Sequence, residues 1–229
     1  MLTVHHLQVS QSERIVWLCE ELGLEYELKC YPRDPYFSPQ AIKDLHRMGA
    51  APLISDTGIR GTLGESGACV EWILTKYGAN SPLVLKADHK DFDQYLYWLH
   101  AANGSLQPAA MRAFTAASCG VEPTQRARAN ADSRLINELD YYNDHLSENV
   151  WLSGDNFTTA DLMTVFTFTT MRRFTQQDLT KYPAILAWLG RVAKRDAYVK
   201  AMAKGDPDMD WQDAIKGAPP LSFQKWKGL

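Results

Sequence analysis

The sequence predicts a chain of two parts, an α/β domain at the N-terminal end and an all-helical C-terminal domain. Two observations predict this division. Strand and helix patterns alternate as far as Gly78, in the order βαβ, short α, ββα, and from Asp88 onward only helical periodicity remains. The 229 residues, 45% of them hydrophobic, are enough for two compact cores. We therefore expect domains at residues 1–80 and 88–229, joined by a linker around Pro82.

The N-terminal segment predicts a βαβ unit. Leu2–Leu7 has the composition of a short strand, and Tyr26–Tyr31 alternates apolar and polar residues like a second one. Between them, apolar residues recur with the spacing i, i+3, i+4, i+7 of an amphipathic helix, at Ile15, Leu18, Cys19 and Leu22. Gly23 is placed to end this helix. A connection this short implies a tight right-handed crossover between parallel strands.

The rest of the first domain predicts a hairpin followed by a helix. After a proline-rich loop and a short helix at 41–45, a strand is expected to begin at Pro52, where a missing N–H is tolerated. The turn signal Thr57-Gly58 then predicts an antiparallel partner strand at Ile59–Leu63. A helix over Ser66–Tyr77 closes the domain.

Four apolar stripes predict a helical bundle for the second half. Their members are Phe92, Tyr95, Leu96 and Leu99; Ala131, Leu135, Leu139, Tyr142 and Leu146; Leu162, Val165, Phe166 and Thr169; and Ile185, Trp188, Leu189 and Val192. Thr158 and Asp161 have the spacing of a capping box, with Phe157 and Leu162 at the staple positions. We expect this motif to direct folding and to carry no chemistry. The last 20 residues are expected to form an extended tail.

Charge and composition argue against several classes of partner. A formal net charge of -3 provides no basic field for nucleic acid or for an anionic membrane surface. No apolar run approaches the length that spans a bilayer, and no leader pattern opens the sequence, so a cytoplasmic protein is expected.

The four cysteines, at positions 19, 30, 69 and 119, form no CxxC pair and are expected to be reduced, buried thiols. His5 and His6 point to opposite faces of a strand, and we predict no metal site.

Four segments, in order along the chain, resemble landmarks of the glutathione transferase family. They are the segment from His5 to Gly23, the loop Met48-Gly49-Ala50-Ala51-Pro52-Leu53-Ile54, the motif Gly64-Glu65-Ser66-Gly67-Ala68, and Trp151 to Asp161 together with Tyr182-Pro183 through Arg191. The His-x-Leu and Ser-x-Ser-x-x-Arg opening is similar to fungal and bacterial members of the serine type. The resemblance implies a thioredoxin-like N-terminal domain that holds glutathione and a helical domain that holds the second substrate.

The resemblance also implies site residues. Ser10, four residues before Arg14, would stabilise the glutathione thiolate, with Ser12 as the alternative donor. Pro52 would form a cis peptide bond that turns the backbone of Ala51 toward the cysteinyl part of the ligand. Glu65 would pair with the α-amino group, and Ser66 would bind the α-carboxylate at a helix N-terminus. From the residues alone, Ser10 also fits an N-cap with Glu13 at N3, which is the structural alternative.

The implied function is a transferase that activates the glutathione thiol for attack on hydrophobic electrophiles, with detoxification as its role and a homodimer as its assembly. The alternative is a non-catalytic relative that binds ligands or proteins. A cysteine-dependent thiol transferase would need a cysteine at the loop serine position, which this chain lacks. Ala50 stands where family members carry Lys or Gln for the glycine end of glutathione, so either glutathione binds weakly or another residue, such as Arg33 or Lys43, holds that end. Five aromatic residues are candidates to wall an apolar cleft for the second substrate, namely Tyr95, Trp98, Phe114, Trp211 and Trp226.

Overall fold

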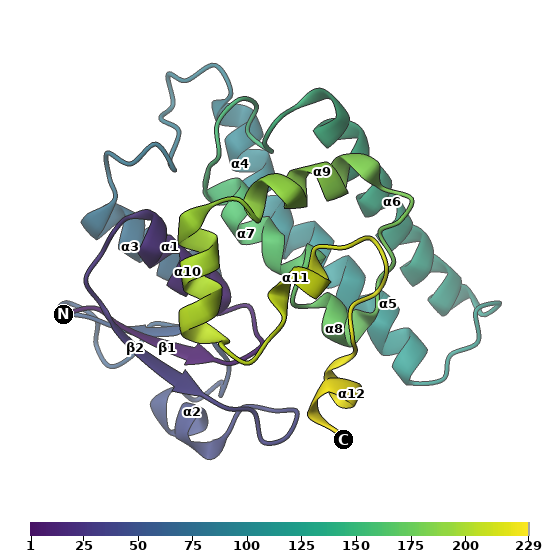
Figure 1. The fold of residues 1–229 in the computed structure, drawn as a ribbon, viewed down its shortest axis with the longest axis horizontal. Helices are drawn as coiled ribbons and strands as arrows, with labels where there is room; N and C mark the ends of the chain where they lie inside the picture. Colours follow the sequence, from purple (N-terminus) through teal and green to yellow (C-terminus); the bar gives the residue numbers. More distant parts are fainter. Residues whose placement is uncertain (229) are drawn as a thin grey trace. The chain divides into compact units, whose positions relative to one another are not determined.

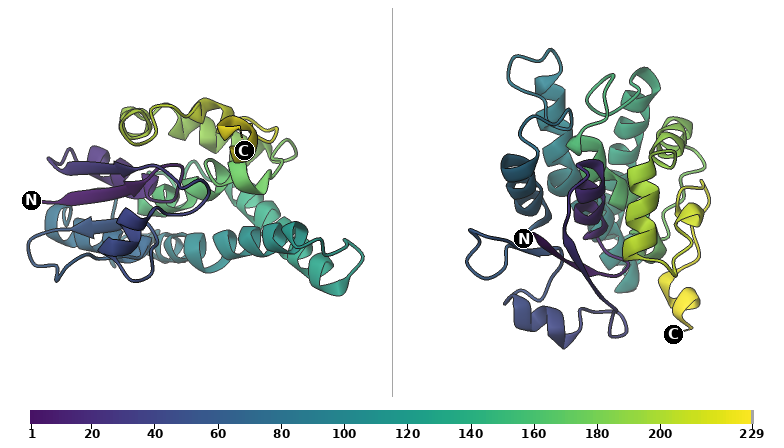
Figure 2. Two further views of the ribbon diagram at one scale, coloured as in Figure 1. Left: turned by 90° about the horizontal axis from the view of Figure 1, so that it is seen from below. Right: turned by 60° about the vertical axis from the view of Figure 1, so that its left-hand side comes forward.

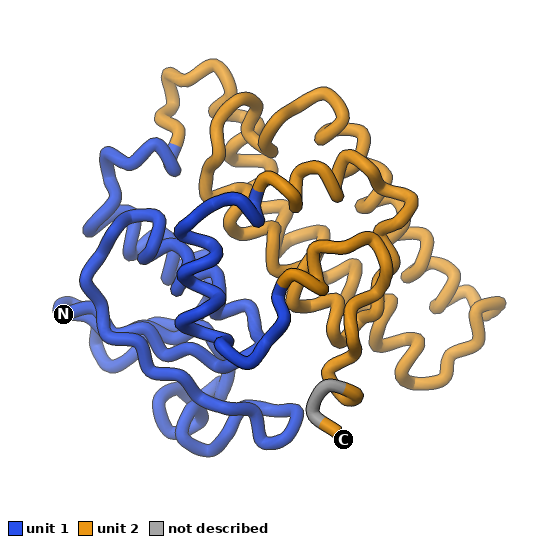
Figure 3. Tube along the Cα trace, viewed as in Figure 1, with its two compact units in different colours: residues 1–84, 192–211 blue, residues 85–191, 212–229 orange. Residues whose placement is uncertain are grey.

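The computed structural model describes residues 1–228, without the side chains of Trp226 and Lys227. It divides into two compact units, shown in blue and orange in Figure 3. Unit 1 comprises Met1–Val84 and Val192–Trp211, and unit 2 comprises Leu85–Arg191 and Gln212–Leu229. The domain boundaries at residues 80 and 88 stay a prediction. Unit 1 also includes the C-terminal segment Val192–Trp211, which the sequence-based division assigns to the second domain.

Unit 1 is built on a three-stranded mixed sheet with the order β2-β1-β3. The central strand β1 (Thr3–Leu7) is parallel to β2 (Glu27–Tyr31) and antiparallel to β3 (Leu53–Ser55). Four of the five residues of β1 are buried, as expected for a strand with neighbours on both edges. The predicted βαβ unit is confirmed.

Helices lie on both faces of this sheet (Figures 1 and 2). The helices α1 and α3 cover one face, and the short helix α2 lies on the other. The helices of unit 1 are α1 (Glu13–Glu21), α2 (Gln40–Leu45), α3 (Ser66–Tyr77) and α10 (Asp196–Gly205). The predicted bounds of α3 are confirmed.

The predicted hairpin is wrong in its second strand. Ile59–Leu63 contributes only one bridge, in which Ile54 and Leu63 exchange two backbone hydrogen bonds of 2.9 Å. Gly58 and Gly61 have φ values of +102° and +80°, which bend the chain away from an extended course. The buried carboxylate of Asp56 ties the loop to α3 instead, because it accepts hydrogen bonds from the side chains of Trp72, Lys76 and Tyr77.

Helix α10 packs on α1 through one small apolar face. Tyr198, Ala201, Met202 and Gly205 are its buried residues, and they have the spacing of a single helical stripe. The ring of Tyr198 meets that of Trp17 edge to face, with centroids 4.8 Å apart. At the edge of the contact, Arg195 forms a bidentate ion pair with Glu21 at 2.6 and 2.7 Å. This packing delivers the residue after the helix, Asp206, to the carboxyl end of β1.

Unit 2 is all-helical in the part of the chain that the structure describes. Its elements are α4 (Phe92–Ala101), the π-helical turn η1 (Ala102–Leu106), α5 (Gln107–Ser118), α6 (Arg126–Glu148), α7 (Thr159–Phe168), α8 (Arg172–Thr175), α9 (Pro183–Val192), α11 (Trp211–Ala214) and α12 (Phe223–Lys227). The fold class predicted from the sequence is thus confirmed, although α11 and α12 replace part of the expected extended tail.

The apolar stripes are confirmed in α7 and α9 and only partly in α4. Helix α7 is buried on all sides, and the four predicted residues of α9 are fully buried. In α4 the buried residues are Tyr95, Trp98 and Ala101, whereas Leu96 is 38% exposed. The large indole ring of Trp98 sets the inward face, because it packs against Tyr142 with ring centroids 4.6 Å apart.

The capping box at the start of α7 is confirmed. Thr158 and Asp161 exchange the two reciprocal hydrogen bonds of the motif. Asp161 also accepts hydrogen bonds from the Leu152 amide and the Trp188 indole, both at 2.9 Å. Burial raises the pKa of its carboxyl group to about 6. Asp161 therefore joins a helix start, a loop and a second helix in one buried network.

Arg172 anchors the chain that follows α11. Its guanidinium is buried and donates to the carbonyl oxygen of Gln177 and to four carbonyl oxygens within 214–218, at 2.7 to 2.8 Å. The planar fork of five N–H groups matches this arrangement of carbonyls. One side chain thus binds four carbonyl oxygens of this segment, and the Leu179 N–H adds a backbone bond to Gly217. No sequence pattern identifies Arg172 for this role.

The cysteine prediction is correct for two residues and wrong for two. Cys19 and Cys69 are buried, and burial raises the pKa of both thiols to about 12. Cys30 and Cys119 are exposed, and all four are free thiols. Within residues 1–228, none of the helices is both long enough and apolar enough to cross a bilayer.

Replacing Asp161 with Asn is expected to destabilise the protein by about 2–4 kcal/mol. The amide keeps one acceptor oxygen and turns its NH2 group toward a buried N–H that then has no partner. Urea titration followed by circular dichroism measures the free energy of unfolding. Asp144→Asn, an exposed change on α6, is the control and should stay within about 0.5 kcal/mol of the wild type. Equal stability of the two variants would contradict the assigned role.

Arg172→Lys is expected to cost about 2–4 kcal/mol and to loosen residues 214–218. An ammonium group keeps the charge but cannot reach five carbonyl oxygens held in a planar fan. Amide hydrogen exchange should show faster exchange in this segment, while α7 keeps its protection. The exposed Arg112→Lys on α5 is the matched control. Unchanged exchange at 214–218 in the Arg172 variant would rule out the anchor.

Candidate functional site

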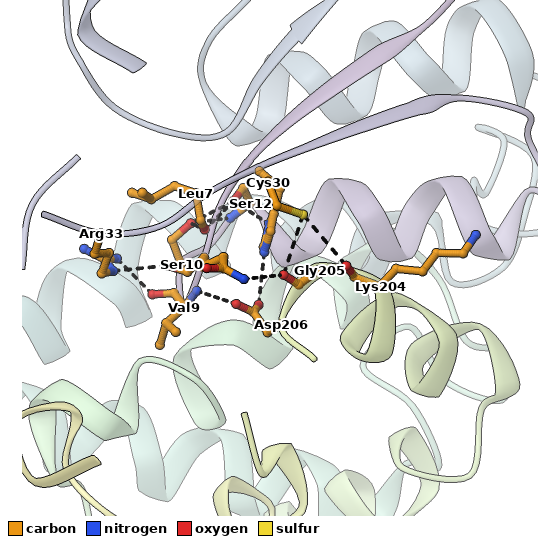
Figure 4. A network of polar contacts seen from close by, with 11 residues as sticks. Leu7, Val9, Ser10, Ser12, Cys30, Arg33, Lys204, Gly205 and Asp206 are labelled. Carbon is orange, nitrogen blue, oxygen red and sulfur yellow. Dashed lines mark hydrogen bonds and ion pairs between the residues drawn. The ribbon is translucent and has the colours of Figure 1, made fainter. Parts of the chain in front are cut away.

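The loop between β1 and α1 has an unusual backbone conformation that two side chains hold. Val9 has a φ of +54°, in the left-handed region that β-branched residues rarely adopt. Its N–H donates to Oδ1 of Asp206 at 2.7 Å, and its carbonyl accepts from Arg33 at 2.8 Å. A carboxylate and a guanidinium thus fix the two polar groups of one residue. Figure 4 shows how these side chains surround the loop.

This bend places two serines side by side. Ser10 Oγ donates to the Leu7 carbonyl at 2.7 Å and lies 2.8 Å from Ser12 Oγ. Ser10 is 5% exposed, whereas Ser12 is fully buried. Both residues are buried, and Ser10 is the less buried of the two.

The interpretation of Ser10 as the helix N-cap is wrong. The N-cap of α1 is Ser12, and no side-chain capping hydrogen bond forms there. Ser10 Oγ instead accepts the Ser12 N–H at 3.2 Å, within the bend that precedes the helix. Both hydroxyl groups are thus committed to a local network and not to the first turn of the helix.

A buried histidine and a buried aspartate extend this network. His6 Nδ1 lies 2.8 Å from Ser12 Oγ, and His6 Nε2 lies 3.1 Å from Oδ2 of Asp206. His6 is fully buried and Asp206 is 3% exposed. Gly205 leaves the space for the imidazole, since a Cβ there would lie 2.9 Å from His6 Nε2. The predicted opposite orientation of His5 is confirmed, because its ring contacts Tyr31 and Ser55.

A second set of contacts links the other predicted site residues to the same helix. Gln11 donates to the Ala51 carbonyl at 3.1 Å, and Arg14 donates to Gln11 at 3.1 Å and to Ser66 Oγ at 3.3 Å. The Ala51-Pro52 peptide bond is cis, as the family resemblance implies. The beginning of α1 therefore connects the loop before β3 to the beginning of α3 within unit 1.

Glu65 stands at the N-terminus of α3 in a strained conformation. It is the N-cap residue, with a φ of +68°, and its side chain is exposed while that of Ser66 is buried. Strain at a non-glycine residue persists only where the surrounding structure imposes it, and such residues gather at functional sites. The exposed carboxylate and the N–H groups of the first helical turn together provide acceptors and donors for a zwitterionic ligand.

Four residues of this region were not predicted from the sequence to take part, namely His6, Gln11, Arg14 and Asp206. His6 is a polar residue inside an apolar strand pattern, and Arg14 serves in the sequence pattern only as the arginine that locates Ser10. Asp206 is separated from His6 by 200 residues, so no local spacing connects them. Among the described residues no group of three His, Cys, Asp or Glu side chains could hold a metal ion, and the absence of a metal stays a prediction.

Two of the aromatic residues proposed to wall a second-substrate cleft do not fit that role. Tyr95 and Trp98 are 4% and 0% exposed, in the core of unit 2. Phe114 is half-buried, and the side chain of Trp226 lies outside the described residues. The prediction is wrong for Tyr95 and Trp98 because both lie on the face of α4 that turns into the core of unit 2.

Comparison with protein families matches both halves of the chain. Residues 10–76 match the model described as "Glutathione S-transferase, N-terminal domain", and residues 106–196 match the model described as "Glutathione S-transferase, C-terminal domain". The first match includes both serines of the loop and the residues around the cis-proline. The second includes the capping box of α7.

Individual proteins agree with these matches. Glutathione S-transferase 3 of Schizosaccharomyces pombe is 31% identical over 86% of this chain and 85% of its own. A glutathione S-transferase structure from Actinobacillus pleuropneumoniae superposes with a TM-score of 0.81 at 26% identity, covering 94% of this chain and 99% of that one. A sphingomonad glutathione S-transferase complexed with glutathione has the same fold, with a TM-score of 0.70 at 20% identity over 88% and 98% of the two chains.

Proposed function

Because the chain belongs to the glutathione S-transferase family, we propose that it is a serine-type transferase in which Ser10 stabilises the thiolate of bound glutathione for attack on a hydrophobic electrophile. Glutathione as the substrate follows from the family and agrees with the sphingomonad relative, whose structure contains it. The observation that carries the proposal is the position of Ser10, at the bend before α1, where it is the less buried of the two neighbouring serines.

The chemistry requires stabilisation of a sulfur anion. A thiol of pKa about 8.5 is mostly protonated at neutral pH, and the thiolate is the nucleophile. Each unit by which the pKa falls corresponds to about 1.4 kcal/mol of preferential stabilisation of the anion. A hydroxyl donor in a bend that leads into a helix N-terminus provides a hydrogen bond and a favourable dipole at one place.

The burial of the two serines favours Ser10 over Ser12 as the donor. Ser12 is fully buried and contacts Ser10, His6 and the Leu7 carbonyl, so a ligand sulfur would meet Ser10 first. Ser10 has two acceptors within the protein, Leu7 O and Ser12 Oγ, and one proton. That proton can rotate toward a new anionic acceptor.

The remaining predicted residues supply the rest of the glutathione site in this proposal. The backbone of Ala51, before the cis-proline Pro52, pairs with the cysteinyl part like an added strand. Glu65 pairs with the α-amino group of the γ-glutamyl end, and Ser66 with the N-terminus of α3 binds its carboxylate. The contacts from Gln11 to Ala51 and from Arg14 to Ser66 support the proposal, because they connect the loop before Pro52 and the beginning of α3 to the same segment at the start of α1.

Lys43 is the better of the two candidates for the glycine carboxylate. Arg33 donates to the carbonyl oxygens of Gln8, Val9 and Tyr36, and its guanidinium is therefore used to hold the loop between β1 and α1. Lys43 is exposed on α2, and its Cγ lies 2.9 Å from the position that a Cβ at Gly49 would occupy, in the loop before Pro52.

Ser10→Ala should raise the pKa of bound glutathione by about one unit and lower kcat with an aryl halide about tenfold at neutral pH. Ultraviolet absorbance of the thiolate and steady-state kinetics measure the two effects. Ser12→Ala is the comparison, because a larger loss there would identify Ser12 as the donor. If neither variant changes the thiolate, the serine-type assignment fails.

Retention of the wild type on immobilised glutathione without any turnover would favour a non-catalytic binding module.

We also propose a homodimer, as is typical of the family. Two tyrosines of unit 2 form an exposed aromatic pair on α4 and α6, with Tyr97 47% and Tyr141 48% exposed and their ring centroids 6.0 Å apart. Ile136 on α6 is 50% exposed. Exposed aromatic residues are enriched at protein interfaces, which supports this face as the contact between two copies.

Tyr97→Asp combined with Tyr141→Asp is expected to shift the protein from dimer to monomer. Two carboxylates would be buried without partners if the interface formed. Light scattering coupled to size exclusion gives the mass. Val199→Asp, at an exposed apolar position on α10, is the control and should leave the mass unchanged. A dimer that survives the double substitution would place the interface elsewhere.

A further inference from the structure

We propose that His6, held by Asp206, receives the proton that the glutathione thiol loses, and that this proton travels through Ser10 and Ser12. The inference rests on the proposed function and deepens it. His6 touches no substrate, so it acts as a positioning residue and proton acceptor behind the serines. The observation is a continuous row of polar atoms that begins at the least buried hydroxyl and ends at a buried carboxylate (Figure 4).

The distances allow a hydrogen bond at every link of this row. Ser10 Oγ and Ser12 Oγ are 2.8 Å apart, Ser12 Oγ and His6 Nδ1 are 2.8 Å apart, and His6 Nε2 and Asp206 Oδ2 are 3.1 Å apart. Ser12 and His6 are fully buried. A proton that passes from Ser10 to Ser12 is therefore shielded from bulk water until it reaches the imidazole.

The carboxylate fixes the direction of the hydrogen bonds. An ionised Asp206 only accepts, and its Oδ1 already accepts from the Val9 N–H, so Oδ2 requires the hydrogen on His6 Nε2. In the neutral imidazole Nδ1 then carries a lone pair, which accepts the hydroxyl proton of Ser12. Ser12 Oγ can in turn accept from Ser10, whose single proton turns from the Leu7 carbonyl to Ser12 for the transfer. This alignment is the one that a transfer toward His6 needs.

The transfer balances without any further reactant. The S–H bond of glutathione breaks and its proton forms a bond to Ser10 Oγ. The original proton of Ser10 passes to Ser12, and the original proton of Ser12 passes to His6 Nδ1. Both hydroxyl groups end neutral, with the Ser10 proton directed at the sulfur. The negative charge lies on the sulfur, and the positive charge lies on an imidazolium beside Asp206.

The surroundings favour this distribution of charge. Asp206 is the anion in direct contact with His6, and pairing with it offsets the cost of a buried imidazolium. On the neighbouring strand, partial burial of the thiol and then the charge of Asp206 raise the pKa of Cys30. Arg33 is a cation outside the row that interacts with the charge of Asp206, and it is bound to loop carbonyls. On α1, the charged side chain of Arg14 is directed to Gln11 and Ser66.

A measurement on the unmodified protein tests the inference first. Glutathione is mixed with the protein at neutral pH in weak buffer, while thiolate absorbance and a pH indicator are followed together. The relay predicts that thiolate appears with almost no proton released to solvent. If no thiolate forms, the proposed function itself fails. If thiolate forms and an equal amount of proton is released, the function stands and the relay is overturned.

Asp206→Asn is the decisive variant, because it preserves the shape of the site. The amide oxygen must accept from Val9, so the NH2 group faces His6 Nε2 and forces the imidazole hydrogen onto Nδ1, the wrong tautomer for accepting a proton. Thiolate at neutral pH should fall about tenfold, and the residual thiolate should release its proton to solvent. Because hydroxide can then remove the proton, kcat should recover toward the wild-type value at alkaline pH, which a structural defect would not allow.

His6→Asn is the second variant and His5→Asn its matched control. The amide side chain that replaces His6 can reach Ser12 but cannot take up a proton, so the same fall and the same alkaline recovery are expected. His5 is the adjacent buried imidazole with two side-chain contacts of its own, to Tyr31 and Ser55, and its replacement should leave the proton balance unchanged. Wild-type proton balance and pH profile in folded Asp206→Asn or His6→Asn would overturn the relay, as would equal effects in His5→Asn.

Discussion

The carboxylate of Asp206 lies out of contact with bulk water, and each of its oxygens must therefore find a donor within the protein. Its two donors come from one short stretch, the Nε2 atom of His6 in β1 and the N–H of Val9 in the following loop. Since Asp206 directly follows α10, its position depends on how that helix packs on α1. The conformation of the loop that carries Ser10 is thus set by a residue about 200 positions away in the sequence.

The loop is held more firmly than a surface loop of this length usually is. The left-handed conformation of Val9 costs on the order of 1–2 kcal/mol. Charge-assisted hydrogen bonds to Asp206 and Arg33, each about 1.5–3 kcal/mol, offset that cost at both polar groups of the residue. The hydroxyl of Ser10 is therefore placed before any ligand arrives, so that binding spends little free energy on ordering it.

Local patterns predicted what local interactions determine. The βαβ unit, α3, the apolar faces of α7 and α9 and the capping box at Thr158 all follow from residues within a few positions of one another. The prediction failed where distant residues decide. Asp56 draws the segment after β3 toward α3, so Ile59–Leu63 forms one bridge in place of a strand. The sequence predicted Ser10 through a family motif, but His6 meets Asp206 only after α10 has packed, and no spacing predicts that contact.

The division of the chain at residue 80 separates residues that the site requires together. A fragment ending there would retain Ser10, Ala51, Pro52, Glu65 and Ser66, but it would lack α10 and Asp206. Val9 would lose the acceptor of its N–H, and His6 would lose the carboxylate that orients its hydrogen, which leaves two buried polar groups without partners. The unit that would form the proposed glutathione site is therefore discontinuous in sequence. Buried hydrogen bonds to Asp206 and Arg33 hold the loop that carries Ser10. These bonds, more than the sheet that bears the loop, determine where the Ser10 hydroxyl points.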